Sequence, residues 1–175
     1  MTLGEKIHQL RAFAGIDGLL LALIWISSFG CYLGQFGHPA LSIVWLLFAV
    51  STPFFVAFRL RHFRDEALDG SISFRRAFAY CIMVFLYASI LFALAQWAYF
   101  NYVDQGFLLS QFGLIMHREE SQAVLEAYKL TPEMLDTIME DIGKMTPIDL
   151  SLGFANMNLT GGFFMSLIIA AIMRK

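Results

Sequence analysis

Charged residues are scarce in this chain. Asp, Glu, Lys and Arg together make up 15% of its 175 residues, whereas a soluble domain is usually about one quarter charged. Hydrophobic residues make up 58%. A soluble fold of this composition would expose far too much apolar surface. We therefore expect lipid to surround most of the chain, which is long enough for one domain.

Other kinds of residue and motif are also missing. The net charge of −2 gives no basic field for nucleic acid. The two cysteines, Cys31 and Cys81, form no CxxC pair and lie inside apolar runs, as small buried residues do. The four histidines lie in separate segments, and no phosphate loop, nucleophile elbow or metalloprotease motif occurs. We therefore predict no cofactor, no metal site, no catalytic residue and no enzymatic activity.

Uncharged runs locate four membrane spans. No charge occurs between residues 18 and 58, and the glycines and proline of GQFGHP at 34–39 predict a turn within that stretch. The expected spans are about 13–33, 40–58, 77–103 and 150–173, each close to the roughly 20 residues that cross a bilayer. No A-x-A cleavage site follows the first span, so we expect it to be retained.

The positive residues predict the orientation of these spans. With both termini in the cytoplasm, nine of the twelve lie on that side, including those of the loop expected at 59–76. The nine are Lys6, Arg11, Arg59, Arg61, Arg64, Arg75, Arg76, Arg174 and Lys175. The segment 104–149 is then extracytoplasmic, and it carries nine acids against three bases.

The extracytoplasmic segment contains amphipathic helical patterns. Residues 105–116 are uncharged and too short to cross, so they are expected along the membrane surface. Thr131 as N-cap and Pro132 as first residue predict a helix that ends at Gly143. Its apolar face packs on the protein or the lipid boundary, or else docks a partner protein. That face consists of Met134, Leu135, Ile138, Met139 and Ile142.

Polar residues inside the spans form two predicted levels. Asp17 is the only charge within a span, and it is either a structural anchor or a proton, ion or ligand site. Depth matching places it level with Ser51, Thr52 and Tyr80. Further out, Asn156 and Thr160 lie one turn apart near Asn158, and Gly153, Gly161 and Gly162 offer small surfaces for close helix approach. Hydrogen bonding between helices or a substrate path would each explain this second level.

Two stretches carry a family resemblance. DGSISFRRAF at 69–78 and LTGGFFMSLIIAAIMRK at 159–175, with four spans and an acidic outer segment, resemble a bacterial membrane family catalogued as domain of unknown function four-one-nine-nine. The resemblance implies the inner membrane of a Gram-negative cell and carries no activity to transfer. Basic residues near the first stretch either anchor the chain or bind phosphorylated headgroups. They are Arg59, Arg61, Arg64, Arg75 and Arg76.

The sequence thus predicts an all-α, integral membrane four-helix bundle with amphipathic helices between spans three and four. Its expected environment is the lipid bilayer, with another membrane protein or a second copy as possible partner. The leading hypothesis is a non-enzymatic accessory or scaffold subunit. The alternative is a small oligomeric transporter or lipid-handling protein that uses Asp17 and the Asn156 and Thr160 face.

Overall fold

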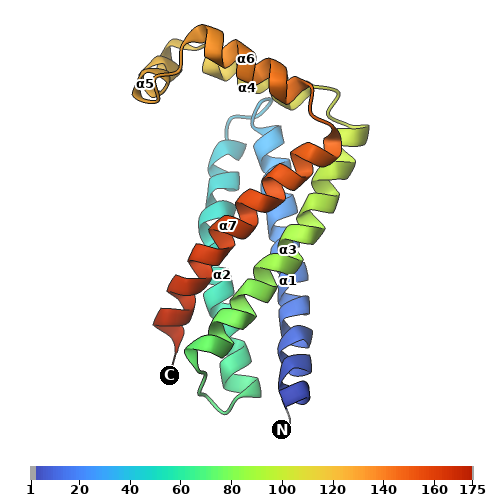
Figure 1. Ribbon diagram of the computed structural model, residues 1–175, viewed down its shortest axis with the longest axis vertical. Helices are drawn as coiled ribbons and strands as arrows, with labels where there is room; N and C mark the ends of the chain where they lie inside the picture. The colour runs from blue at the N-terminus through green and yellow to red at the C-terminus, as the bar shows by residue number, and fades with distance from the viewer. Residues whose placement is uncertain (1–2, 175) are drawn as a thin grey trace. The chain divides into compact units, whose positions relative to one another are not determined.

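The computed structural model describes residues 3–174, and in that range it contains helices and no strands. The predicted all-α fold is confirmed. Lys175, which the orientation argument counted, lies outside the described residues. The helices are α1 (Leu3–Gly34), α2 (Leu41–Ala67), α3 (Phe74–Tyr102), α4 (Phe107–Met116), α5 (Glu119–Ala127), α6 (Pro132–Gly143) and α7 (Pro147–Met173) (Figure 1).

Four of these helices are long and apolar enough to cross a membrane, as predicted: α1, α2, α3 and α7. The loop predicted at 59–76 was too long. In the structure α2 continues to Ala67 and α3 begins at Phe74. Arginine, alanine and glutamate favour helix, so the end of the apolar run ends the span without ending the helix. The actual connection turns at Asp69 and Gly70, both with positive φ (52° and 81°).

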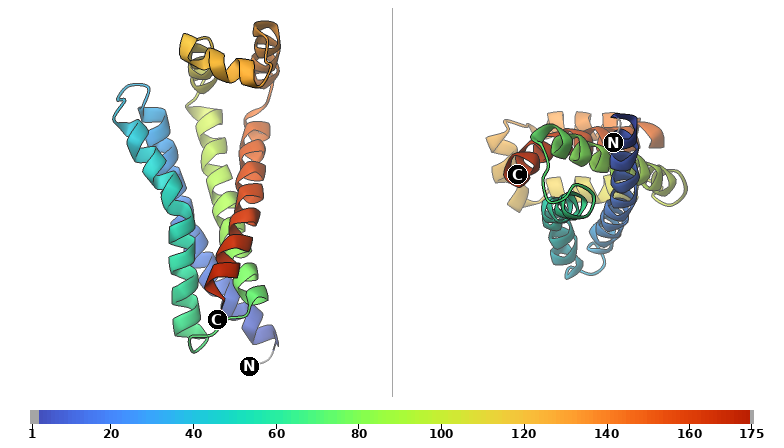
Figure 2. Two further views of the ribbon diagram at one scale, coloured as in Figure 1. Left: turned by 90° about the vertical axis from the view of Figure 1, so that its left-hand side faces the viewer. Right: turned by 90° about the horizontal axis from the view of Figure 1, so that it is seen from below.

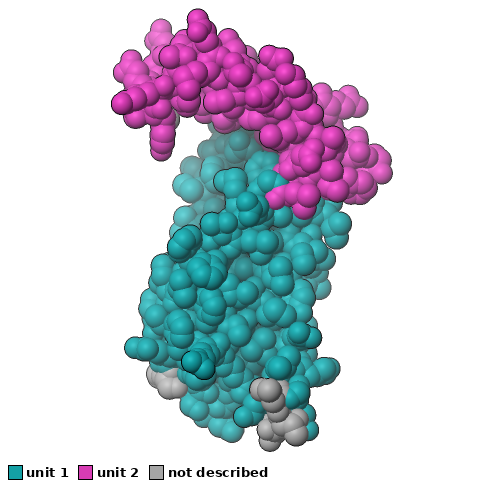
Figure 3. Space-filling model, viewed as in Figure 1, with its two compact units in different colours: residues 1–95, 153–175 teal, residues 96–152 magenta. Residues whose placement is uncertain are grey.

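The chain divides into two compact units, which are described separately (Figure 3). The first contains residues 1–95 and 153–175, and therefore most of the four long helices. The second contains residues 96–152, with the end of α3, the three short helices and the start of α7.

In the first unit, α1 and α2 form an antiparallel pair with a constant register (Figure 2). Gln9 bonds to Ala67, Asp17 to Arg59 and Trp25 to Thr52. The residue numbers in these pairs sum to 76 or 77, so the two helices keep the same register from Gln9 through Asp17 to Trp25. The contacts of α1 with α3, such as Trp25 with Phe92, run parallel instead.

Two glycines allow helices of the first unit to approach closely. A Cβ on Gly18 of α1 would lie 2.6 Å from the Tyr87 Cβ of α3. A Cβ on Gly162 of α7 would lie 2.7 Å from Phe85 Cγ of α3. By contrast, Gly153 and Gly161, which were expected to serve the same purpose, have nothing within 4 Å of a built Cβ. These two glycines have no close neighbours because of the way α7 is rotated about its own axis.

The second unit is organised by packing between its short helices. As predicted, Thr131 caps α6, and its hydroxyl accepts from Met134 N at 3.2 Å. Pro132 is the first residue and Gly143 the last. Leu135 of α6 is buried, and Met139 Cε lies 3.2 Å from the Cβ position of Gly113 in α4. The α6 helix therefore packs part of its apolar face against its own chain.

Candidate functional site: a buried ion pair joining three helices

Asp17 forms the centre of a polar cluster inside the first unit. Its side chain is fully buried in α1, and its Oδ1 accepts from Arg59 Nε of α2 at 2.5 Å. The Tyr80 hydroxyl of α3 donates to Oδ2. Burying a lone carboxylate in lipid costs several kcal/mol, and a paired, hydrogen-bonded one far less. Both carboxylate oxygens thus have partners, and the cluster connects three helices.

Aromatic rings enclose this cluster. Phe63 of α2 stacks on the Tyr80 ring with centroids 4.8 Å apart and planes 7° apart. Phe13 of α1 also packs against Phe63, with ring centroids 5.2 Å apart. The Arg76 guanidinium lies 5.7 Å from the Phe63 centroid, within cation–π range. Tyr80 and Phe63 are both fully buried, so apolar surface shields the Asp17 side of the ion pair and fixes the tyrosine ring, whereas the Arg59 side chain is 21% exposed.

A second set of polar contacts lies near the helix ends beside the termini. Arg76 Nη2 donates to Gln9 Oε1 at 3.0 Å, and Gln9 Nε2 donates to the Ala67 carbonyl at 3.5 Å. Arg64 Nη1 donates to the Met173 carbonyl at 3.5 Å, at the end of α7. Arginine donors satisfy helix-terminal carbonyls that have no intrahelical partner. These contacts join all four long helices at one end of the unit.

The residues predicted to lie at the same membrane depth as Asp17 were partly wrong. Tyr80 is its partner, as the depth argument placed it, but Thr52 accepts from Trp25 Nε1 at 3.0 Å. Ser51 donates to the Phe48 carbonyl of its own helix at 2.7 Å. The residue of α2 level with Asp17 is Arg59, seven positions beyond Thr52, or about 10 Å along the helix. The error arose because α1 and α2 extend beyond their apolar runs.

The arginines suggested for headgroups have several different surroundings. Arg59 is the partner of Asp17, and Arg64 is 7% exposed and bonded to Asp65 Oδ1 at 2.8 Å. Arg76 is held by Gln9. Arg61 lies 3.5 Å from Asp65 Oδ2 through its Nε, but its side chain is 67% exposed, so it and the exposed Arg75 remain accessible to headgroups. Two of the five residues thus keep a free surface.

The polar residues further along the spans differ in burial between α7 and α3. Asn156 and Thr160 of α7 are exposed, Asn158 is half-buried, and none of the three side chains makes a hydrogen bond within residues 3–174. On α3, Ser89 Oγ and Gln96 Oε1 are buried without a partner in the same described range. The structure therefore does not bring the Asn156 face together with Asp17.

The family of the chain follows from a match over most of its length. Residues 16–175, which include Asp17, Arg59 and Tyr80, match the family model described as "Protein of unknown function (DUF4199)". The chain belongs to this family. The comparison with curated proteins found no match, and the comparison with solved structures found none either. The resemblance seen in DGSISFRRAF and the C-terminal stretch is thus confirmed, and DUF4199 membership carries no activity with it.

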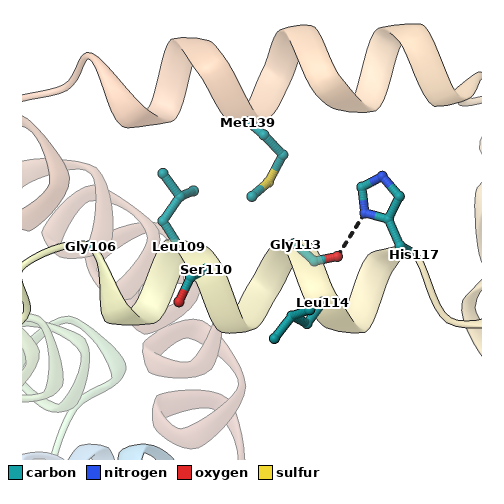
Figure 4. A pocket seen from close by; sticks show the side chains of 7 residues that line it. All are labelled: Gly106, Leu109, Ser110, Gly113, Leu114, His117 and Met139. Carbon is teal, nitrogen blue, oxygen red and sulfur yellow. Dashed lines mark hydrogen bonds between the residues drawn. The ribbon is translucent and has the colours of Figure 1, made fainter.

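The predicted docking face of this DUF4199 chain is divided by packing. Leu135 is buried, Met139 and Ile142 are half-buried, and Met134 and Ile138 remain 49% and 39% exposed. Figure 4 shows Met139 of α6 pointing toward α4, where a hollow of about 550 Å³ lies between the two helices. Its lining is mostly apolar, with Leu109 and Leu114 of α4, and His117 Nδ1 lies 2.8 Å from the Gly113 carbonyl oxygen.

Sequence reasoning missed two helix starts in this DUF4199 chain. Asp104 accepts from the backbone N–H groups of Gly106 and Leu108, at 3.1 and 3.0 Å, just before α4. Thr146 and Asp149 form a reciprocal capping box at the start of α7. The Thr-x-x-Asp spacing was the signal that could have placed the start of α7 at Pro147. Within the described residues, no group of three His, Cys, Asp or Glu side chains could hold a metal ion.

Proposed function

We propose that this DUF4199 chain is a non-enzymatic accessory or scaffold subunit of a bacterial inner membrane, with both termini in the cytoplasm. Nine of its twelve positive residues lie at the termini and between spans two and three. In the first unit the start of α1, the end of α7 and the connection between α2 and α3 are at the same end of the helices, which supports this orientation (Figure 1).

The exposed part of the α6 face carries the proposal. Met134 and Ile138 lie one turn apart and stay exposed after Leu135 and Met139 have packed inward. Methionine is a flexible, polarizable side chain that adapts to partner surfaces. The same helix bears exposed acids, such as Asp136 and Glu140, which anionic headgroups repel. An acidic helix with a free apolar strip is better suited to a protein than to a lipid surface.

The state of Asp17 favours this function over transport. A proton- or ion-coupled transporter needs a carboxylate that can release and rebind its ligand. Both oxygens of Asp17 are already bonded, to Arg59 and to Tyr80, and the residue is fully buried. We therefore assign the ion pair to holding α1, α2 and α3 together.

Affinity purification in mild detergent tests the proposal. We expect an integral membrane protein to co-purify in fixed ratio, and the double substitution Met134→Ser and Ile138→Ser to abolish this without changing thermal stability. A matched control is Met145→Ser, because Met145 is 48% exposed just beyond α6 and should leave binding unchanged.

A buried residue of the same helix separates binding from folding. Leu135→Ala removes a side chain that is 4% exposed, so we expect it to destabilise the second unit by about 2–5 kcal/mol. Hydrogen exchange should then rise throughout α4 and α6. The proposal is overturned if the chain purifies without any partner, or if the Met134 and Ile138 substitutions leave the partner bound.

A further inference from the structure

One face of α7 carries polar groups that its own chain leaves unpaired. Asn156 and Thr160 are one turn apart and exposed, and their side chains make no hydrogen bond in the described part of the chain. The serines of α7 differ, because Ser151 and Ser166 donate to the Pro147 and Gly162 carbonyls at 2.6 Å each. The hydroxyls that face inward are thus satisfied within the helix, whereas the Asn156 amide has no partner.

These groups lie near the middle of the span. α7 contains residues 147–173, and Thr160 is thirteen residues from either end. Asn156 is one turn closer to the outer end, or about 6 Å away. At this depth no water competes for the amide, so an unpaired Asn side chain is costly and favours association with another helix.

We propose that this face of α7 binds the same face of a second copy of the chain, in a two-fold symmetric dimer. Two copies inserted with the same orientation have parallel α7 helices, so identical residues lie level across an axis normal to the membrane. The Asn amide carries both a donor and an acceptor, and the Thr hydroxyl does too. Asn156 and Thr160 can therefore satisfy their own counterparts, whereas another partner would need matching groups at both depths.

One glycine on the same side of α7 is free for such a contact. A Cβ built on Gly153 meets nothing within 4 Å, whereas Gly162, on the opposite side of the helix, packs against Phe85 of α3. Small residues let helix backbones approach closely enough for interhelical hydrogen bonds. The dimer is separate from the proposed docking at α6, since it uses none of the α6 residues.

Cysteine cross-linking in native membranes tests the contact directly. In a chain with Cys31→Ser and Cys81→Ala, we expect Asn156→Cys or Gly153→Cys to form a disulfide-linked dimer with a mild oxidant. Met165→Cys is the matched control. It is 41% exposed and about 140° around α7 from Thr160, so it should not cross-link.

The strength of association is measured from the dimer dissociation constant in detergent. Asn156→Leu should raise that constant about threefold to thirtyfold, the range for one interhelical polar contact. Asn156→Gln, which keeps an amide, should retain more of the dimer. Because Asn156 is exposed in the single chain, thermal stability of the Asn156→Leu monomer should be unchanged.

The outcomes separate the dimer from the proposed α6 docking. A monomeric chain of 19.8 kDa that still holds a partner protein through Met134 and Ile138 overturns the dimer alone. A cross-linked dimer without any other protein overturns the docking alone. Equal cross-linking at positions 156 and 165 also overturns the dimer, because it shows collisions without a specific face.

Discussion

The Asp17 carboxylate and the Arg59 guanidinium are the residues on which the first unit depends most. Their shared hydrogen bond crosses 42 positions of sequence, and the Tyr80 hydroxyl adds a third helix. A buried ion pair often adds little net stability, yet removing one partner leaves an uncompensated charge. Asp17 therefore stabilises the packing of α1 against α2 only while Arg59 is present.

Single and double substitutions at this pair should behave differently. We expect Arg59→Met to lower the free energy of unfolding in mild detergent by about 3 kcal/mol, because Asp17 then lacks its counter-charge. Adding Asp17→Leu should recover most of that loss. A double variant as unstable as the sum of its single variants would contradict a coupled pair, and unchanged stability of Arg59→Met would show that the contact is unimportant.

At the scale of helices, close approach at individual glycines sets the packing. Gly18 of α1 leaves room for the backbone of α3, and a Cβ there would lie 3.0 Å from the Val84 carbonyl oxygen. Gly15, one turn earlier in the same helix, has nothing within 4 Å of its Cβ position. Two glycines of the same helix, three residues apart, thus have different roles.

Alanine at each position tests this difference. Gly18→Ala should destabilise the first unit by about 1–3 kcal/mol, since neither the Tyr87 Cβ nor the α3 backbone can move freely. Gly15→Ala should be neutral or stabilising by up to about 1 kcal/mol through helix propensity. Thermal unfolding in detergent measures both. Equal effects at the two positions would mean that α1 and α3 are not in close contact at Gly18.

For the whole molecule, the expected topology has both termini and the Asp69 turn in the cytoplasm, and α4–α6 outside. Reporter fusions at residues 70 and 130 should give opposite results, since alkaline phosphatase is active only outside the cytoplasm. The physical basis is the distribution of positive residues, nine of which lie near the termini or in 59–76 and only three in 104–149. If residue 130 is cytoplasmic, the outer position of the α6 face is wrong.

Features that depend on local chemistry could be predicted from the amino-acid sequence alone. Uncharged runs gave four apolar helices, Thr131 and Pro132 gave the start of α6, and Gly143 gave its end. Each depends on neighbours within a few residues, or on the simple preference of apolar side chains for lipid. The start of α7 is also local, since the Thr146 and Asp149 capping box marks it.

The contacts between residues of different helices could be known only from the folded structure. It paired Asp17 with Arg59 rather than placing it beside Thr52, filled Gly162 but left Gly161 open, and buried Leu135 while exposing Ile138. These outcomes depend on the register and rotation of helices that are far apart in sequence. A shift of one residue rotates a helix by about 100°, and no periodicity in one helix fixes its rotation against another.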